Sequence, residues 1–305
     1  MKRLAGRFVG GVWVVVAATA AAWLLFRLLR PNLFADEPGS LVSQLWHYLE
    51  RAFLHFDFGR SERGSQRPVS DLIREGVPAD ASLLFGGLIA GLLGGVGGGI
   101  VCARRPRGWL SRTLQGGALV GMGAPVYVVG LSLLLLFGQE IGTVPVLHVI
   151  PLHYVPFAES PVRWVGSLIV PWLVLGLPLA GMCLRVMLGE MVEVADLDYV
   201  RAARAKGLTE RVILRRHVAP AALAPTAMLA SASMPLLLAN AVLVEQVFSI
   251  PGVFSDFAQA IGTANTTLIL GATAVGAALI AITTFLFDLF LTWLDPRVRA
   301  REGAS

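Results

Sequence analysis

The sequence predicts an all-α membrane protein in which six helices cross the bilayer. Of its 305 residues, 55% are hydrophobic and only 15% are charged, and the mean hydropathy is +0.70. A soluble domain carries about a quarter charged residues, so this composition excludes a large aqueous fold. Six uncharged runs reach the ~20 residues that a helix needs to cross ~30 Å of hydrocarbon. They are Phe8–Phe26, Ala81–Ala103, Thr113–Gly138, Trp164–Leu184, Val218–Val244 and Phe257–Phe287, the last most apolar from Leu268 onward.

The first run has two interpretations. Lys2, Arg3 and Arg7 precede an apolar segment, and Ala20–Ala22 resembles a cleavage site, which together suggest a secretory signal peptide. The apolar run continues through Phe26, however, and exceeds the 7–15 residues usual for such a segment. We therefore favour a retained transmembrane helix.

The segments between the runs divide into an external loop and a proline-rich loop. Within the loop 31–80, apolar residues of Ser40–His55 recur at helical spacing and predict an amphipathic segment. Ile141–Ala158 contains three prolines, which disfavour a helix, so it is expected to be an extended loop. His148 and His153 in this loop have no cysteine or carboxylate at ligand spacing, and no metal site is predicted. The apolar residues at helical spacing in the amphipathic segment are Leu41, Leu45, Tyr48, Leu49, Ala52, Phe53 and Phe56.

Cys102 and Cys183 are interpreted as structural thiols.

The distribution of basic residues predicts the orientation. Basic residues concentrate on the side that holds both termini, which the positive-inside rule assigns to the cytoplasm. The predicted organisation is an N-terminal helix 1–30, the external loop 31–80, a five-helix core 81–296 that includes a polar loop 198–217, and a cytoplasmic tail 297–305. The basic residues on the cytoplasmic side are Lys2, Arg3, Arg7, Arg104, Arg105, Arg107, Arg112, Arg201, Arg204, Lys206, Arg211, Arg215, Arg216, Arg297, Arg299 and Arg301.

The second apolar run is rich in glycine, reading FGGLIAGLLGGVGGGIV from Phe85 to Val101. Glycines allow helix backbones to approach closely in lipid, so this run predicts tight helix packing. It is not a phosphate-binding loop, because no strand precedes it and no Gly-Lys-Ser/Thr follows. No cofactor or nucleotide site is predicted on this chain.

The polar loop between the fourth and fifth runs contains DYVRAARAKGLTERVILRRH, Asp198–His217. Asp198–Lys206 suits a short helix, and Gly207 is a natural helix stop because it tolerates positive φ. Thr209 can then cap a second helix that runs to about Arg216. Two short helices joined at a glycine would form a knob that transmits force to a partner. A basic loop lying against anionic lipid is the alternative.

This segment resembles the cytoplasmic EAA signature of ABC importer permeases, and more narrowly the B-type permease subunit of the dipeptide/oligopeptide/nickel family. Ala202, Ala203 and Gly207 occupy the alanine and glycine positions of that signature, and Arg201 replaces its glutamate. Other ordered segments also resemble the family, so the resemblance covers nearly the whole chain. They are LHFDFGRS at 54–61 with Pro68-Val69 and Val77-Pro78, WLSRTLQ at 109–115, GAPVYVVGL at 123–131, EQVFSIPGV at 245–253 and LDPRVR at 294–299.

The chain departs from the family pattern mainly in its external parts. The loop 31–80 is shorter than usual, Phe254 replaces a second glycine, and Ala264-Asn265-Thr266 replaces an Arg-Asp-Tyr. Leu291 replaces a tyrosine. These departures bear on binding-protein docking and on the substrate, and they leave the polar loop intact.

The resemblance implies a type I ABC importer permease fold in the bacterial inner membrane, with the loop 198–217 as coupling helix. Its implied partners are a C-type permease homologue, two ATPase subunits that hold ATP and magnesium, and an extracytoplasmic substrate-binding protein. The chain itself would be non-catalytic, and its cargo would be di- or oligopeptides. Nickel chelates and glutathione are alternative cargoes. The implied ATPase-coupling residues are Arg201, Ala202, Ala203, Lys206, Gly207, Leu208 and Arg211.

The fifth run supplies candidates for the translocation pathway, namely Ser231, Ser233, Asn240 and Glu245, with Pro235 as an expected kink. The serines have an alternative role, in which each hydroxyl bonds back to its own helix. Charged residues lie at the ends of the runs, whereas a proton-coupled secondary transporter would place them near mid-bilayer. A membrane enzyme would need a catalytic cluster at one face, and none is found in the sequence.

Overall fold

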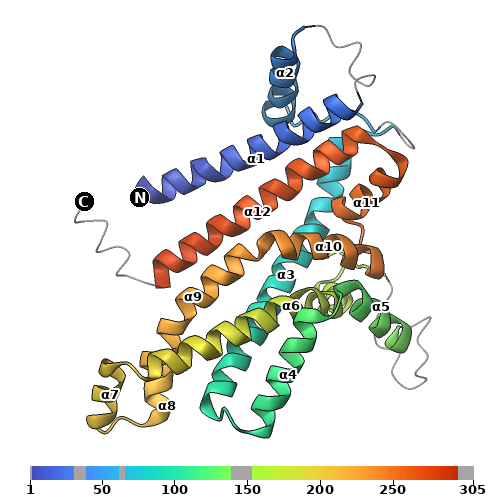
Figure 1. Ribbon diagram of the computed structural model, residues 1–305. Coiled ribbons are helices and arrows are strands. Elements are labelled where there is room, and N and C mark those ends of the chain that lie inside the picture. The colour runs from blue at the N-terminus through green and yellow to red at the C-terminus, as the bar shows by residue number, and fades with distance from the viewer. Residues whose placement is uncertain (1, 31–38, 62–65, 139–152, 295–305) are drawn as a thin grey trace. The chain divides into compact units, whose positions relative to one another are not determined.

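The computed structural model describes residues 2–30, 39–61, 66–138 and 153–294, and every regular element in these ranges is a helix (Figure 1). The described chain forms two compact units. Unit 1 contains Met1–Ser82 and Ser249–Phe285, and unit 2 contains Leu83–Phe248 and Leu286–Ser305.

Four helices of the described chain are long and apolar enough to cross a membrane, and up to six crossings result if each of two bent helix pairs is one span. The all-helical membrane fold predicted from composition is therefore confirmed. The four long helices are α1 (Lys2–Leu29), α3 (Val69–Arg104), α6 (Pro161–Ala195) and α12 (Thr266–Leu294).

The third predicted run, Thr113–Gly138, is not one straight helix. It contains α4 (Trp109–Gly123) and α5 (Val126–Phe137), which meet at an angle of 108°. Ala124 is extended and Pro125 follows it. A proline has no backbone N–H and disfavours helical geometry in the preceding residue, so the helix ends there.

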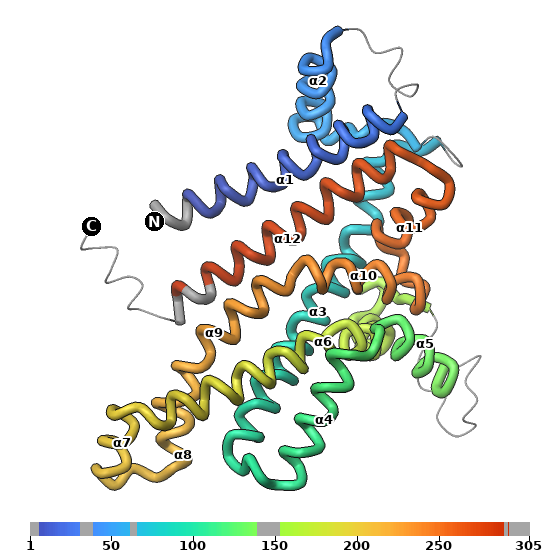
Figure 2. Tube along the Cα trace, viewed as in Figure 1, coloured from blue at the N-terminus to red at the C-terminus, as the bar shows by residue number. Residues whose placement is uncertain are grey.

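The fifth predicted run is also bent, near the expected proline. The helix α9 (Ala219–Ala232) is followed by α10 (Met234–Phe248) with a bend of 54°, which can be followed along the trace in Figure 2. Pro235 lies in the first turn of α10, where its missing N–H breaks no helical hydrogen bond. The kink prediction is therefore confirmed.

Three other runs have different bounds from those predicted. The helix α3 begins at Val69, well before Ala81, and α6 continues to Ala195, past Leu184. The sixth run divides into α11 (Val253–Thr263) and α12, because Ala264 adopts a left-handed conformation with φ of 58°. Hydropathy marks only the apolar part of a helix, and polar residues extend it at either end.

The glycines of α3 form the packing face of unit 2, as predicted. Gly87, Gly91, Gly95 and Gly99 recur every fourth residue, and a methyl group on each would overlap atoms of α6. A Cβ atom at Gly95 would lie 2.4 Å from the Cβ atom of Cys183. Small residues at this spacing allow two helix backbones to come into close contact in lipid.

Both cysteines are free and fully buried, which confirms their interpretation as structural thiols. Cys183 lies against the glycine face of α3, and Cys102 belongs to a cluster with Ala118 and Leu184. As small apolar groups they fill space between helices of unit 2.

In unit 1, α1 packs on α12 and on α2 (Leu41–Leu54). Trp23 stacks on Tyr48 with 6.3 Å between ring centroids. The predicted helix of Ser40–His55 is present, with Ser40 as its N-cap. The predicted stripe is buried only in part: its members Tyr48 and Ala52 are buried together with Gln44, whereas Leu41 and Phe53 are exposed. The partner, rather than hydrophobicity alone, decides which face is covered.

Two of the sequence predictions lie outside the described residues. They are most of the predicted extended loop, including His148, and nearly all of the C-terminal segment LDPRVR.

Candidate functional site

The polar loop folds into a knob at one end of unit 2, formed by α7 (Asp198–Ala205), α8 (Glu210–Ile213) and the π-helix η2 (Leu214–Val218) (Figure 1). The segment η2 continues directly into α9. The name "knob" is used below for residues 198–218.

An apolar cluster fixes the knob to the ends of α6 and α9. Val200, Ile213 and Val218 are fully buried, and they pack with Met187 and Met191 of α6. Burial of an aliphatic side chain contributes about 1.5–3 kcal/mol, so several such contacts hold the knob firmly. Movement of the knob would therefore be passed to both helices.

The turn between α7 and α8 is closed by backbone hydrogen bonds around Gly207. The N–H of Gly207 donates to the carbonyl of Arg204 over 2.9 Å, and the N–H of Leu208 donates to that of Ala203 over 3.4 Å. These bonds form a Schellman motif, which requires positive φ at the residue after the C-cap. Gly207 has φ of 80°, which confirms the predicted helix stop.

Arg204 of α7 links α8 to the end of α6. Its Nε donates to Glu210 over 2.7 Å, and its Nη1 donates to the carbonyl of Ala195 at the end of α6 over 3.0 Å. The hydrogen bond to Glu210 raises the pKa of the guanidinium. On the other side of the knob, the hydroxyl of Tyr199 donates to the carbonyl of His217 over 3.3 Å. Exposed ion pairs contribute at most about 1 kcal/mol, so these contacts fix geometry more than stability.

The predicted coupling residues separate into an exposed set and one buried member. Ala203 is 7% exposed and belongs to the apolar cluster, so it positions α7 and is not available to a partner. Arg201 is exposed and lies 3.7 Å from Asp198. The exposed members are Arg201, Ala202, Lys206, Gly207, Leu208 and Arg211.

The second half of the knob differs from its prediction in two details. Thr209 precedes α8 as its N-cap residue, but its side chain makes no capping hydrogen bond. The predicted helix to Arg216 is instead a single turn of α-helix followed by a π-helix. A π-turn depends on which side chains must face the core, and local sequence patterns do not reveal it.

The four candidate pathway residues lie on the bent pair α9–α10. The Ser233 hydroxyl donates to the carbonyl of Leu229 over 2.8 Å, which is the alternative role foreseen for it. Ser231 and Asn240 are half-buried, and the side chain of Glu245 is fully buried. A role of these residues in lining a passage stays a prediction.

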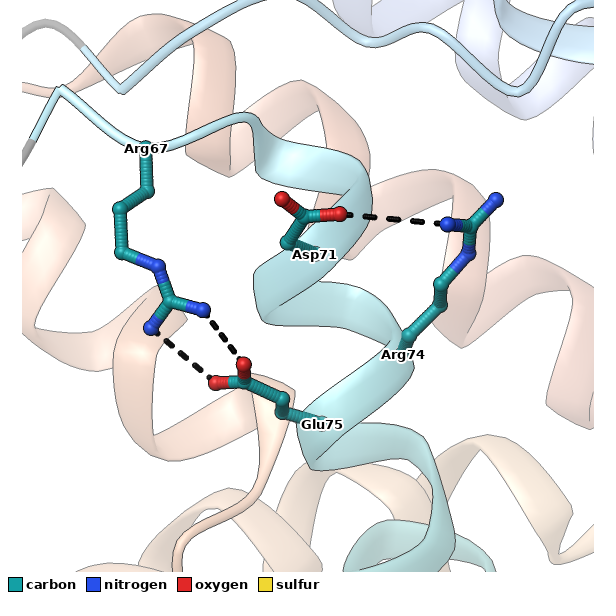
Figure 3. A network of polar contacts seen from close by, with 4 residues as sticks. All are labelled: Arg67, Asp71, Arg74 and Glu75. Atoms are coloured by element: carbon teal, nitrogen blue, oxygen red, sulfur yellow. Dashed lines mark hydrogen bonds and ion pairs between the residues drawn. The ribbon is translucent and has the colours of Figure 1, made fainter.

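A charged cluster lies at the start of α3 in unit 1 (Figure 3). Arg67 forms a bidentate pair with Glu75, one hydrogen bond of which is 3.1 Å, and Arg74 lies 3.9 Å from Asp71. Burial raises the pKa of Asp256 on α11, as does the charge of Glu75, whereas the charge of Arg67 lowers it. The bidentate pair with Glu75 raises the pKa of Arg67.

Sequence reasoning did not single out Arg204, Glu210 or Tyr199 as residues that organise the knob. A signal existed for the first two, because opposite charges six residues apart flank a glycine turn. No comparable signal marks Tyr199, whose partner is a backbone carbonyl.

Comparison with known proteins found a matching family and several similar proteins. Residues 95–300 match the family described as binding-protein-dependent transport system inner membrane component. A putative peptide transport system permease protein of Brucella abortus (strain 2308) is 32% identical over 286 residues, covering 94% of this chain and 88% of the relative.

Two further relatives have similar names. A dipeptide transport system permease protein of Bacillus subtilis (strain 168) is 26% identical, covering 97% of each chain. A probable D,D-dipeptide transport system permease protein of Escherichia coli (strain K12) is 29% identical, covering 95% of this chain and 88% of the relative.

Proposed function

Since this chain belongs to the family of binding-protein-dependent transport system inner membrane components, we propose that it forms half of the translocation pathway of an ATP-driven peptide importer. Relatives that cover nearly the whole chain are named peptide or dipeptide transport permeases, which supports peptides as cargo. Proteins of this family are transport components of the inner membrane, and the apolar helices agree with a multi-pass arrangement.

The knob carries the mechanistic part of the proposal. It offers an exposed surface on α7 and the following turn, while its buried side is fixed to α6 and α9. A separate ATPase subunit that binds this surface would move the ends of both helices when it closes on ATP. The coupling residues would be the exposed Arg201, Ala202, Lys206, Leu208 and Arg211, with Gly207 shaping the turn and Ala203 seating the helix.

The remaining assignments complete the importer. Two ATPase subunits would hold ATP and magnesium, a homologous C-type permease would supply the second half of the pathway, and a substrate-binding protein would deliver the peptide. Both termini and the knob would face the cytoplasm, because basic residues concentrate on that side. Residues of α9 and α10, among them Ser231, Asn240 and Glu245, would line or border the passage.

Gentle purification from the native membrane tests this proposal. The full chain, tagged after Ser305, is isolated in mild detergent, and the accompanying proteins are identified by mass spectrometry. We expect two copies of an ATPase and a second permease, and ATP hydrolysis by the assembly that increases with peptide-loaded binding protein. A stable chain that purifies alone from a membrane where the proposed partners are expressed would contradict the proposal.

A further inference from the structure

The knob has a second surface, built from α8 and η2, of which the proposed ATPase contact uses only Arg211. Arg211, Val212, Arg215 and Arg216 line an open groove of about 690 Å³. All three arginines are exposed. Among the described residues, none of the three forms an ion pair, in contrast to Arg201 and Arg204 of α7, which each contact a carboxylate.

The π-turn is what gathers the three guanidinium groups. In η2 the N–H of Ala219 donates to the carbonyl of Leu214, five residues back. Residues five apart lie about 140° apart around an α-helix, but a π-turn brings them to one face. Ile213 and Val218 accordingly both point into the apolar cluster with no exposed surface. Arg211 and Arg216 are also five residues apart, and both line the groove together with Arg215.

The groove is located where a lipid headgroup would be found. Arg216 is three residues before Ala219, the first residue of the apolar α9. At ~1.5 Å per residue, Arg215 and Arg216 lie within about one helical turn of the start of the predicted hydrocarbon span, and Arg211 lies about one turn further out. The headgroup region of each leaflet extends about 5–8 Å beyond the hydrocarbon. Exposed guanidinium groups at this depth meet phosphate oxygens.

The chemistry of the groove selects an oxyanion. A guanidinium presents a planar fork of N–H donors that matches two phosphate oxygens, and three such groups with no carboxylate paired to them favour one or two negative charges. Volumes of about 300–1,000 Å³ are typical of small-molecule sites, so a phosphodiester with its glycerol fits. We propose that this groove binds the phosphate headgroup of an anionic phospholipid, which would anchor the knob to the inner leaflet.

This inference does not depend on the ATPase contact, because the residues that its test replaces, Arg215 and Arg216, are not among the proposed coupling residues. Of the groove residues, only Arg211 belongs to both sets. Its test uses the full chain, purified in detergent and delipidated, and counts bound lipid by native mass spectrometry. The probes are phosphatidylglycerol, phosphatidylcholine with the same acyl chains, and inorganic phosphate as a competitor. Each arginine near an anionic surface contributes a factor of about five in binding.

We expect the double variant R215Q/R216Q to bind phosphatidylglycerol about 25-fold more weakly, with phosphatidylcholine binding unchanged. The double variant R215K/R216K keeps both charges but lacks the planar guanidinium groups. Its affinity for phosphatidylglycerol should lie between those of R215Q/R216Q and the wild type. The matched control is R104Q/R105Q, which removes two exposed arginines where α3 ends and the connection to α4 begins, at the same end of unit 2 (Figure 1). Its affinity for phosphatidylglycerol should fall by less than about threefold.

Three results would overturn the inference. Equal loss in R215Q/R216Q and in the control would show general attraction to anionic lipid without a site. Full displacement of phosphatidylglycerol by millimolar inorganic phosphate would make soluble phosphate the ligand. Unchanged lipid binding in R215Q/R216Q together with loss of the co-purifying ATPase would assign the groove to a protein contact. If the glutamine variant does not fold, judged by size-exclusion profile and helical content, R215K/R216K decides by the same measurement.

Discussion

The side-chain carboxylate of Asp80 accepts a hydrogen bond from the backbone N–H of Val253, with 3.2 Å between Oδ2 and the nitrogen. The two residues are 173 positions apart, and both belong to unit 1. Val253 is the first residue of α11, whose N-cap residue, Gly252, has no side chain that could cap the helix. Gly76 permits the contact, because a Cβ atom there would lie 2.6 Å from the nitrogen of Val253. A carboxylate on α3 thus caps the N-terminus of α11.

Replacement of Asp80 should loosen α11. The variant D80A leaves a buried N–H without its acceptor, and we expect a loss of about 1–2 kcal/mol in the free energy of unfolding. D80N keeps an acceptor oxygen and should lose less. Thermal unfolding of the detergent-purified chain measures both, and D71A, at an exposed position on the same helix, is the control. A D80A protein that unfolds at the wild-type temperature would contradict the capping role.

The glycine face of α3 gives a second prediction with a control on the same helix. In G95A the new methyl group meets Cβ of Cys183 at 2.4 Å and the carbonyl of Ala180 at 2.8 Å, so α3 and α6 must separate. Overpacking of this kind costs about 1–3 kcal/mol. In G97A the methyl group has nothing within 4 Å, and the variant should be neutral or slightly more stable. Equal unfolding temperatures for the two variants would show that the contact is not tight.

At Gly207 the backbone conformation, and not the space around the side chain, restricts substitution. Nothing lies within 4 Å of a Cβ atom built at this glycine, so only its φ of 80° restricts substitution. G207V should strain the turn by about 1–2 kcal/mol and abolish peptide uptake while the chain stays in the membrane. G207N tolerates positive φ and should keep most of the uptake. Uptake and membrane abundance are measured in parallel, and full uptake by G207V would contradict the coupling role of the turn.

The charged cluster of unit 1 predicts a pH dependence. Burial raises the pKa of Asp256 above its ordinary 3.8, so the folded state retains the proton to higher pH than the unfolded chain does. The free energy of unfolding should therefore fall as pH rises from about 4 through the raised pKa. D256N cannot ionise, so its free energy of unfolding should not show this decrease. Relative to the wild type, the variant should therefore become more stable as pH rises from about 4 to 7.

A companion variant shifts the same titration in the opposite sense. Arg67 lowers the pKa of Asp256, so R67Q should raise that pKa further and steepen the loss of stability with pH. Unfolding temperatures of wild type, D256N and R67Q are compared across this pH range. Parallel curves for the wild type and D256N would mean that Asp256 does not contribute.

Much of the molecule could be predicted from local patterns. Apolar runs without charges identify membrane helices, because the bilayer imposes the same length on each. The glycine spacing of α3 indicated a close helix contact, and Gly207 marked a turn that needs positive φ. These features depend on residues that are near one another in the chain, so the amino-acid sequence is enough to predict them.

Which surfaces are available to a partner depends on packing between distant parts of the chain. Ala203 belongs to the coupling signature yet lies in the apolar cluster with Ile213 and Met191. The π-turn that gathers the arginines exists because Ile213 and Val218 must both face that cluster. The cap that Asp80 provides for α11 joins residues far apart in the chain. Such features follow from packing between distant segments, so local sequence patterns do not predict them.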